Sequence, residues 1–160
     1  MDMIMKKLFL EAMGSVATGV SVIATSGEAG SMAMTVSAFA SLSADPPLVL
    51  ACVRMASPIC AIIERNGMFT LNVLASGQEH VADCFAGRAG QYPAFSLECV
   101  QWSGPDMHMA DALVSFNCRL AAMHSAATHR IITGTVTDIV INKDLEPLLH
   151  RHGRYRQIAR

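Results

Sequence analysis

The sequence predicts a mainly β protein, an antiparallel β-barrel with short helices. About six segments are rich in β-branched residues or alternate between apolar and polar residues, which is typical of strands. Turns and about three short helices join consecutive strands, and such connections favour antiparallel pairing over a parallel sheet. The length of 160 residues fits a single domain that spans residues 1–160.

The composition excludes several classes of protein. An apolar fraction of 52% with only 16% charged residues excludes a disordered chain. A net charge of −1 lacks the basic excess of a protein that grips nucleic acid through its phosphates. No apolar run reaches the roughly 20 residues that a membrane-spanning helix needs. The mean hydropathy of +0.36 is therefore attributed to surface that a homodimer buries.

The cysteines and the N-terminus predict a cytoplasmic protein. The cysteines are scattered without a C-x-x-C pair, so they predict neither a disulfide framework nor a zinc site. They are interpreted as small core residues in a reducing compartment. Their positions are Cys52, Cys60, Cys84, Cys99 and Cys118. Residues 1–14 lack a signal-peptide pattern and predict an amphipathic helix that belongs to the domain.

The first half of the chain predicts a hairpin and a buried strand. Residues 15–25 and 31–39 are expected to pair as a hairpin, because glycines bracket the turn between them. Asp45-Pro46-Pro47 indicates a turn, and the continuous apolar run 48–53 indicates a buried strand.

Two short helices are predicted from their end signals. Ser57-Pro58 begins the first, as N-cap and first helical residue, and Gly67 ends it. After a strand at 68–74, the capping box Ser76–Glu79 opens the second helix, which ends at Gly87.

The last third predicts a long irregular segment followed by two strands. Residues 88–111 contain glycines and prolines without periodicity, and loops of that length are often functional. Alternation predicts a half-buried strand from Val114 to Leu120. A second long strand covers 130–142, where Gly134 indicates a bulge or a close backbone approach.

No self-sufficient catalytic or metal motif stands in the sequence. It contains no nucleophile elbow, zinc-protease helix, phosphate-binding loop or dinucleotide-binding glycine pattern. His150 and His152 lack a third ligand at suitable spacing, so no metal site is expected.

An ordered series of short motifs carries the functional prediction. Thr-x-Ser-Ala-Phe stands at 35–39, Asp-Pro-Pro at 45–47, Asn-Val-Leu at 72–74 and Phe-Ala-Gly at 85–87. In this order the series resembles the flavin reductase-like family, whose fold is an FMN-binding split β-barrel of antiparallel Greek-key type. The resemblance implies an NAD(P)H:flavin oxidoreductase that transfers hydride from NADH or NADPH to FMN or FAD. It also implies a homodimer that supplies reduced flavin to a partner monooxygenase.

Residues 35–38 are the first candidate flavin contacts. Thr35 and Ser37 are two positions apart, so on a strand both point to one face. Together with Val36 and Ala38 they offer hydroxyls, backbone N–H groups and little bulk to the polar edge of a flavin ring. The alternative is an amphipathic strand whose serine and threonine face water.

Arg54 and Ser57 form the second candidate set. A helix N-terminus offers free N–H groups to an anion, and these two residues add a fixed positive charge and a hydroxyl. The resemblance implies that this loop binds the flavin phosphate and that the backbone of Cys52 and Val53 lines the flavin. The alternative is an ordinary N-cap serine beside a surface arginine.

The resemblance adds contacts from later in the chain. It implies that Phe85, Ala86 and Gly87 form a corner that touches the flavin, although Phe85 also fits a core position and Gly87 a helix end. It places Tyr155 near the flavin or at the dimer contact.

His129 is the candidate for a catalytic role. The family's Gly-Asp-His triplet, whose histidine is assigned to the nicotinamide side, is here Ala127-Thr128-His129. The alternative is a structural histidine at the start of a strand. Hydride transfer between two rings needs orientation rather than a general acid or base. Two other functions remain open: a flavin-binding module of this fold without reductase activity, and a small barrel without a cofactor.

Overall fold

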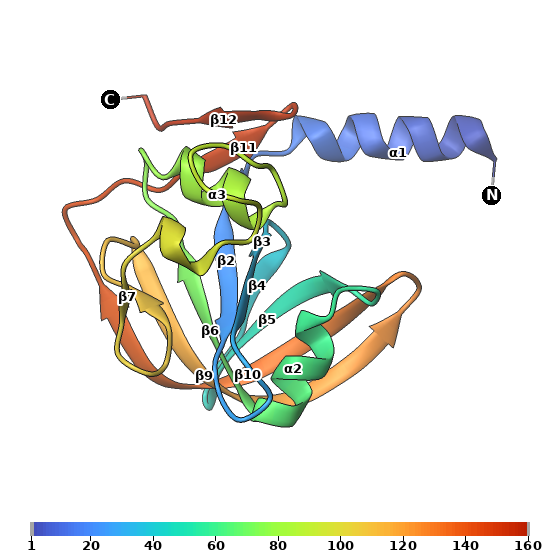
Figure 1. Cartoon of the computed structure of the whole chain (residues 1–160). Coiled ribbons are helices and arrows are strands. Elements are labelled where there is room, and N and C mark those ends of the chain that lie inside the picture. The colour runs from blue at the N-terminus through green and yellow to red at the C-terminus, as the bar shows by residue number, and fades with distance from the viewer. Residues whose placement is uncertain (1, 160) are drawn as a thin grey trace.

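The computed structural model describes residues 2–159, which form antiparallel sheets with three α-helices around them (Figure 1). In chain order the elements are α1 (Met3–Ser15), β1 (Thr18–Gly19), β2 (Ser21–Thr25), β3 (Met32–Val36), β4 (Phe39–Ala44), β5 (Pro47–Arg54), α2 (Ile59–Asn66), β6 (Met68–Val73), α3 (Glu79–Phe85), the 3₁₀ helix η1 (Leu97–Cys99), β7 (Trp102–Ser103), β8 (His108–Met109), β9 (Val114–Ala126), β10 (His129–Ile141), β11 (Leu149–Arg151) and β12 (Arg154–Arg156).

The main sheet has seven strands in the order β3-β2-β6-β9-β10-β5-β4, and every neighbouring pair is antiparallel. Its two longest strands, β9 and β10, have 13 residues each and run across the molecule as one long hairpin (Figure 1). Two smaller sheets, β1-β11-β12 and β7-β8, accompany it, and Ala75 and Pro147 form an isolated antiparallel bridge. The predicted mainly β architecture with antiparallel strands and short helices is confirmed.

The core consists of two clusters of buried side chains, each associated with a helix. One includes Ile59 and Ile63 of α2, which pack with Phe69 of β6. The other includes Val81 and Phe85 of α3. Burying an apolar side chain of this size contributes roughly 1.5–3 kcal/mol. Apolar burial therefore holds both helices against the sheet, and strand β3 contacts both of them.

The strand predictions are correct in place, with different ends. Strands β2 and β3 form the predicted hairpin, but the first strand does not begin at Ser15, because α1 extends to that residue. The second strand stops at Val36, and Phe39 already belongs to β4. Asp45 and Pro46 form the turn between β4 and β5, as predicted, and Pro47 already begins β5.

The predicted cap at Ser57 is wrong. Pro58 is the N-cap residue of α2, and it has no side-chain capping bond. The Ser57 hydroxyl instead donates to the sulfur of Met34 at 3.4 Å. The predicted end is confirmed, because Gly67 closes α2 with a left-handed φ of +70° that favours glycine.

The predicted capping box at Ser76–Glu79 is also absent. Gln78 is the N-cap residue of α3 and makes no side-chain capping bond. Its side-chain oxygen accepts the backbone N–H of Ala75 at 2.8 Å, so it closes the preceding turn instead of the helix. Local sequence signals of this kind compete with other hydrogen-bond partners nearby.

Gly134 combines both of its predicted features. The register between β10 and β9 shifts between Thr133 and Gly134, which is a bulge. A Cβ atom at Gly134 would lie 2.5 Å from the Phe69 ring and 2.7 Å from the Cβ of Cys118. Any larger residue at this position would push into the core between β6 and β9.

Helix α1 projects from the body of the protein instead of packing on it (Figure 1). The predicted helix is present, but it has no buried residue. Its C-terminal end is held by the turn between β11 and β12: the Gly14 carbonyl accepts the His152 N–H at 2.8 Å, and the Ser15 carbonyl accepts from Arg151 Nε at 2.9 Å. No helix among residues 2–159 is long and apolar enough to cross a membrane.

The segment 88–111 is tied to α3 although it has little regular structure. The Cys84 thiol of α3 donates to the Pro93 carbonyl at 3.4 Å. The Trp102 ring lies 5.9 Å from the Phe85 ring, and its indole N–H donates to the Leu97 carbonyl. These contacts fix the segment over the end of α3.

Candidate functional site

A cavity of about 700 Å³ opens between β3, the loop that leads into α2, and the end of α3. We call it the Arg54 cavity. This volume is within the range of small-molecule and cofactor sites. Its lining is mostly apolar: Met32, Met34, Thr35, Arg54, Ala56, Ser57, Pro58, Phe85, Ala86 and Phe95.

Arg54 supplies a positive charge to this cavity. It is the last residue of β5 and is exposed, and among residues 2–159 no carboxylate lies within ion-pair distance of it. Its neighbour across the strands is His129, the first residue of β10. Paired residues of adjacent antiparallel strands point to the same face. The structure thus brings together two residues that are 75 positions apart in the sequence.

The turn before β10 fixes His129. Ala127 and Thr128 form the two-residue loop of the β9–β10 hairpin, and Ala127 has a left-handed φ of +50°. The Thr128 hydroxyl lies 2.9 Å from Nδ1 of His129. The Thr128 carbonyl also accepts the Met55 N–H at 3.0 Å, which ties this turn to the Arg54 loop.

Thr35 connects β3 to α3. Its hydroxyl donates to the Ala82 carbonyl at 2.7 Å, so only its oxygen lone pairs remain for a ligand. Thr35 and Ala86 also line a smaller cavity of about 140 Å³, which we call the Tyr155 cavity. Ser37 lines it as well, although β3 ends at Val36, so the two residues do not share a strand as their spacing predicts.

Tyr155 lies at the far side of the Tyr155 cavity, with its ring 5.8 Å from that of His150. Its hydroxyl donates to the Asp83 carboxylate at 2.6 Å, and Arg88 pairs with the same carboxylate at 2.7 Å. Burial, followed by the bond to Asp83, raises the pKa of the Tyr155 phenol above its ordinary value.

The other predicted site residues lie next to these cavities or behind them. The Val36 and Val53 side chains are buried in the core, so only their backbone is available to a ligand. The Cys52 N–H already donates to the Ala38 carbonyl at 2.8 Å. Gly87 follows the end of α3 with a φ of +84°.

The sequence analysis missed Phe95 and the two methionines of β3. Phe95 belongs to the irregular segment, where no periodicity assigns a side chain to a face. Met32 and Met34 lie just before the motif at 35–39.

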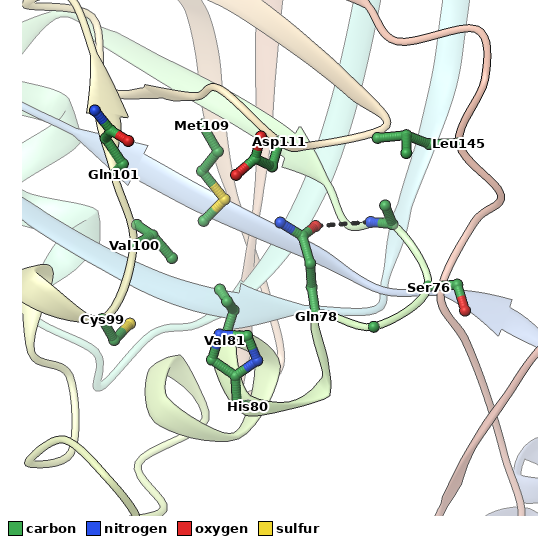
Figure 2. A pocket seen from close by; sticks show the side chains of 12 residues that line it. Ser76, Gln78, His80, Val81, Cys99, Val100, Gln101, Met109, Asp111 and Leu145 are labelled. Atoms are coloured by element: carbon green, nitrogen blue, oxygen red, sulfur yellow. Dashed lines mark hydrogen bonds between the residues drawn. The ribbon is translucent and has the colours of Figure 1, made fainter.

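A second cavity, of about 450 Å³, lies at the opposite end of α3; we call it the Gln78 cavity (Figure 2). Val81, Cys99 and Met109 are its buried lining residues. Gln78 points across it with its oxygen bound to Ala75. None of the described residues that line it is an arginine or a lysine.

The comparison with known proteins identifies the family. A family model described as the flavin reductase like domain matches residues 13–159. The chain belongs to the flavin reductase-like family. The predicted family, split-barrel fold and enzyme class, an NAD(P)H:flavin oxidoreductase, are thereby confirmed.

Named relatives of this flavin reductase agree with that class. The FMN reductase (NADH) RutF 1 of Methylorubrum extorquens is 34% identical over 155 residues, which cover 95% of this chain and 76% of that protein. The reductase component of 4-hydroxyphenylacetate 3-monooxygenase from Thermus thermophilus is 34% identical over 155 residues, covering 97% and 98% of the two chains.

Solved structures agree as well. The flavin reductase PheA2 is 33% identical, with a TM-score of 0.88 over 100% of both chains. The NADH:FAD oxidoreductase SgcE6 of Streptomyces globisporus, solved in complex with NAD and FAD fragments, is 27% identical with a TM-score of 0.88. The superposed regions cover 99% of this chain and 95% of that one.

Proposed function

We propose that the Arg54 cavity binds the flavin substrate, FMN or FAD, with a phosphate at Arg54 and Ser57 and the ring beside Met34 and Ala86. The observation that carries this proposal is Arg54 on the wall of a mostly apolar cavity, with no carboxylate of residues 2–159 in ion-pair distance. A flavin nucleotide combines an anionic phosphate with a large, mostly apolar ring, so both features have a partner.

The remaining predicted residues line the flavin in this proposal. They are Val36, Ser37, Ala38, Cys52 and Val53, mainly through their backbone, with Thr35, Phe85, Gly87 and Tyr155 beside them. When bound, the flavin ring accepts two electrons as a hydride from NADH or NADPH. The chain binds the two rings and orients them, and orientation alone lowers the barrier by several kcal/mol.

His129 holds the nicotinamide side in this proposal. Its Nδ1 faces the Thr128 hydroxyl, which leaves Nε2 for the carboxamide or a phosphate of the dinucleotide. Its cross-strand neighbour Arg54 places it next to the flavin phosphate loop.

Anaerobic stopped-flow mixing with NADH tests this reading. The visible absorption band of bound, oxidised flavin is expected to bleach rapidly. A band that persists would assign the chain to a flavin-binding module. A chain that leaves the fluorescence of added FMN unchanged would be a barrel without a cofactor.

The proposed partner is a flavin-dependent monooxygenase that consumes the reduced flavin. The support comes from relatives that are reductase components, such as the 4-hydroxyphenylacetate 3-monooxygenase component and the halogenase reductase BorF. The cytoplasm is the proposed compartment, because the five cysteines are all free thiols. Ultrafiltration after anaerobic reduction is expected to find reduced flavin in the filtrate. Flavin retained with the protein would argue against transfer to a partner.

The proposed oligomer is a homodimer, supported by the uncovered apolar residues of α1. Large exposed apolar side chains follow one another along the helix: Met3, Ile4, Met5, Leu8, Phe9, Leu10 and Met13. Such a surface is typical of a protein–protein contact. We also propose that each subunit of the dimer is a single domain of 160 residues.

Sedimentation at low micromolar concentration tests the dimer. The expected mass is twice the 17.1 kDa of the chain. Replacing Leu8 and Phe9 together by Glu is expected to give a monomer, whereas Lys7→Glu on the same helix serves as the control and keeps the dimer. A monomeric unmodified chain would overturn the proposal.

A further inference from the structure

Phe95 is the most unusual residue of the Arg54 cavity. Its backbone has a left-handed φ of +62°, which few residues other than glycine and asparagine adopt and which is strained for a bulky side chain. Its N–H donates to the Cys84 carbonyl at 2.9 Å, so the hydrogen bond to the end of α3 holds the backbone in place. Strain of this kind persists where the surrounding structure imposes it, and it is concentrated at functional sites.

The Phe95 ring lies directly against Gly87. A Cβ atom at Gly87 would come within 2.9 Å of the ring, so the ring occupies the space that a side chain would take. Gly87 itself has a φ of +84°. Two adjoining backbone positions thus adopt left-handed conformations, and together they direct the ring toward the cavity.

Phe95 is 43% exposed, and it is not among the residues that pack against the α3 core cluster. The fold therefore holds a large apolar ring at the cavity wall instead of burying it. That wall belongs to the α3 side of the cavity, whereas Arg54 and Ser57 belong to the loop before α2. An exposed aromatic ring of this kind can stack against a planar apolar group of a ligand.

We infer that Phe95 contacts the isoalloxazine ring of the flavin and determines the affinity for that ring. This inference rests on the proposed flavin site and deepens it by separating the cavity into two parts. Arg54 and Ser57 recognise the phosphate, and Phe95 recognises the ring. Riboflavin, which has the ring without the phosphate, distinguishes the two parts.

The test is a titration of the full chain with riboflavin and with FMN, followed by flavin fluorescence. Phe95→Ala is expected to weaken both ligands by the same factor, on the order of tenfold, because the ring is common to both. Phe95→Tyr keeps an aromatic ring and is expected to retain both affinities. Leu145→Ala removes a comparably exposed apolar side chain outside the Arg54 cavity and serves as the control.

Two further variants keep the test independent of folding. Phe95→Gly accepts the positive φ without strain, so it removes the ring while relieving the backbone. Gly87→Ala pushes a methyl group against the ring and strains the backbone at position 87. In the Phe95→Gly background, Gly87→Ala is expected to cost less affinity than in the unmodified chain, because the displaced ring is then absent.

The outcomes separate this inference from the proposed site. An unmodified chain that binds neither flavin would overturn the site itself. Unchanged riboflavin affinity in folded Phe95→Ala and Phe95→Gly, with flavin reduction intact in the unmodified chain, would overturn only the role of Phe95. A change confined to the KM for NADH would assign the ring to the nicotinamide and would also overturn the inference.

Discussion

The two cavities at the ends of α3 differ in charge more than in size. The Arg54 cavity has about 700 Å³ and the Gln78 cavity about 450 Å³, and apolar residues make up much of the lining of both. The Arg54 cavity is lined by an arginine that forms no ion pair with any other described residue. The Asp111 carboxylate at the Gln78 cavity carries a negative charge (Figure 2). A phosphate is therefore attracted to the Arg54 cavity and disfavoured at the Gln78 cavity. The charge of the lining, and not the volume, distinguishes the two cavities as flavin sites.

Backbone strain is found near both cavities. Phe95, on the wall of the Arg54 cavity, and Ala127, in the turn beside it, have left-handed φ values that favour glycine. Met107 has such a φ as well, and it lies two positions before Met109 of the Gln78 cavity. Charge therefore distinguishes the two cavities, whereas backbone strain does not.

The largest expected effect tests the difference in charge. Replacing Arg54 and Ser57 together by Ala is expected to weaken FMN binding by about 1.5–3 kcal/mol, the value of a charge-assisted hydrogen bond, and to leave riboflavin binding nearly unchanged. Isothermal titration with both ligands measures it. Asp111→Asn in the Gln78 cavity is the matched control and is expected to change neither affinity. Equal losses for FMN and riboflavin would show that the two residues do not meet the phosphate.

A smaller effect is expected at His129. His129→Ala is expected to raise the KM for NADH about tenfold, which corresponds to about 1.4 kcal/mol, with flavin affinity nearly intact. Steady-state kinetics at saturating flavin measure it, and His80→Ala at the Gln78 cavity is the control. An unchanged kcat/KM together with a lowered Tm would make His129 a structural residue.

The smallest effect concerns the strained turn. Ala127→Gly is expected to stabilise the protein by about 0.5–1 kcal/mol. Glycine adopts the left-handed conformation without strain, and this gain exceeds the cost of the greater entropy that glycine gives the unfolded chain. Urea unfolding at one protein concentration measures it. Ala126→Gly, one position earlier in β9 and without a positive φ, is expected to destabilise instead. If both variants lose stability alike, the turn at Ala127 carries no strain.

Periodicity and turn signals predicted the strands because these depend on neighbouring residues. Gly134 is an example: a glycine inside an apolar strand predicts a bulge, and the bulge is there. The capping predictions at Ser57 and at Ser76–Glu79 failed for different reasons. Gln78 is the N-cap residue of α3, and its side chain closes the preceding turn at Ala75. The Ser57 hydroxyl meets Met34, which is 23 positions away in the sequence. No local pattern contains that contact.

In the candidate site, too, local patterns predicted some features, and others depend on long-range contacts. Arg54 and His129 could be named from the sequence through the family motifs, but their pairing depends on the register between β5 and β10. Phe95 could not be named, because its position depends on how an irregular segment folds over α3. Helix α1 could be predicted as a helix, whereas its exposure depends on how it leaves the barrel.

A crystal structure of the chain grown with FMN tests the assignment of the two cavities most directly. We expect flavin density in the Arg54 cavity, with phosphate oxygens within hydrogen-bond distance of Arg54 or Ser57 and the ring against Phe95. The Gln78 cavity is expected to contain no flavin. Flavin density in the Gln78 cavity, or a phosphate remote from Arg54 and Ser57, would contradict the assignment.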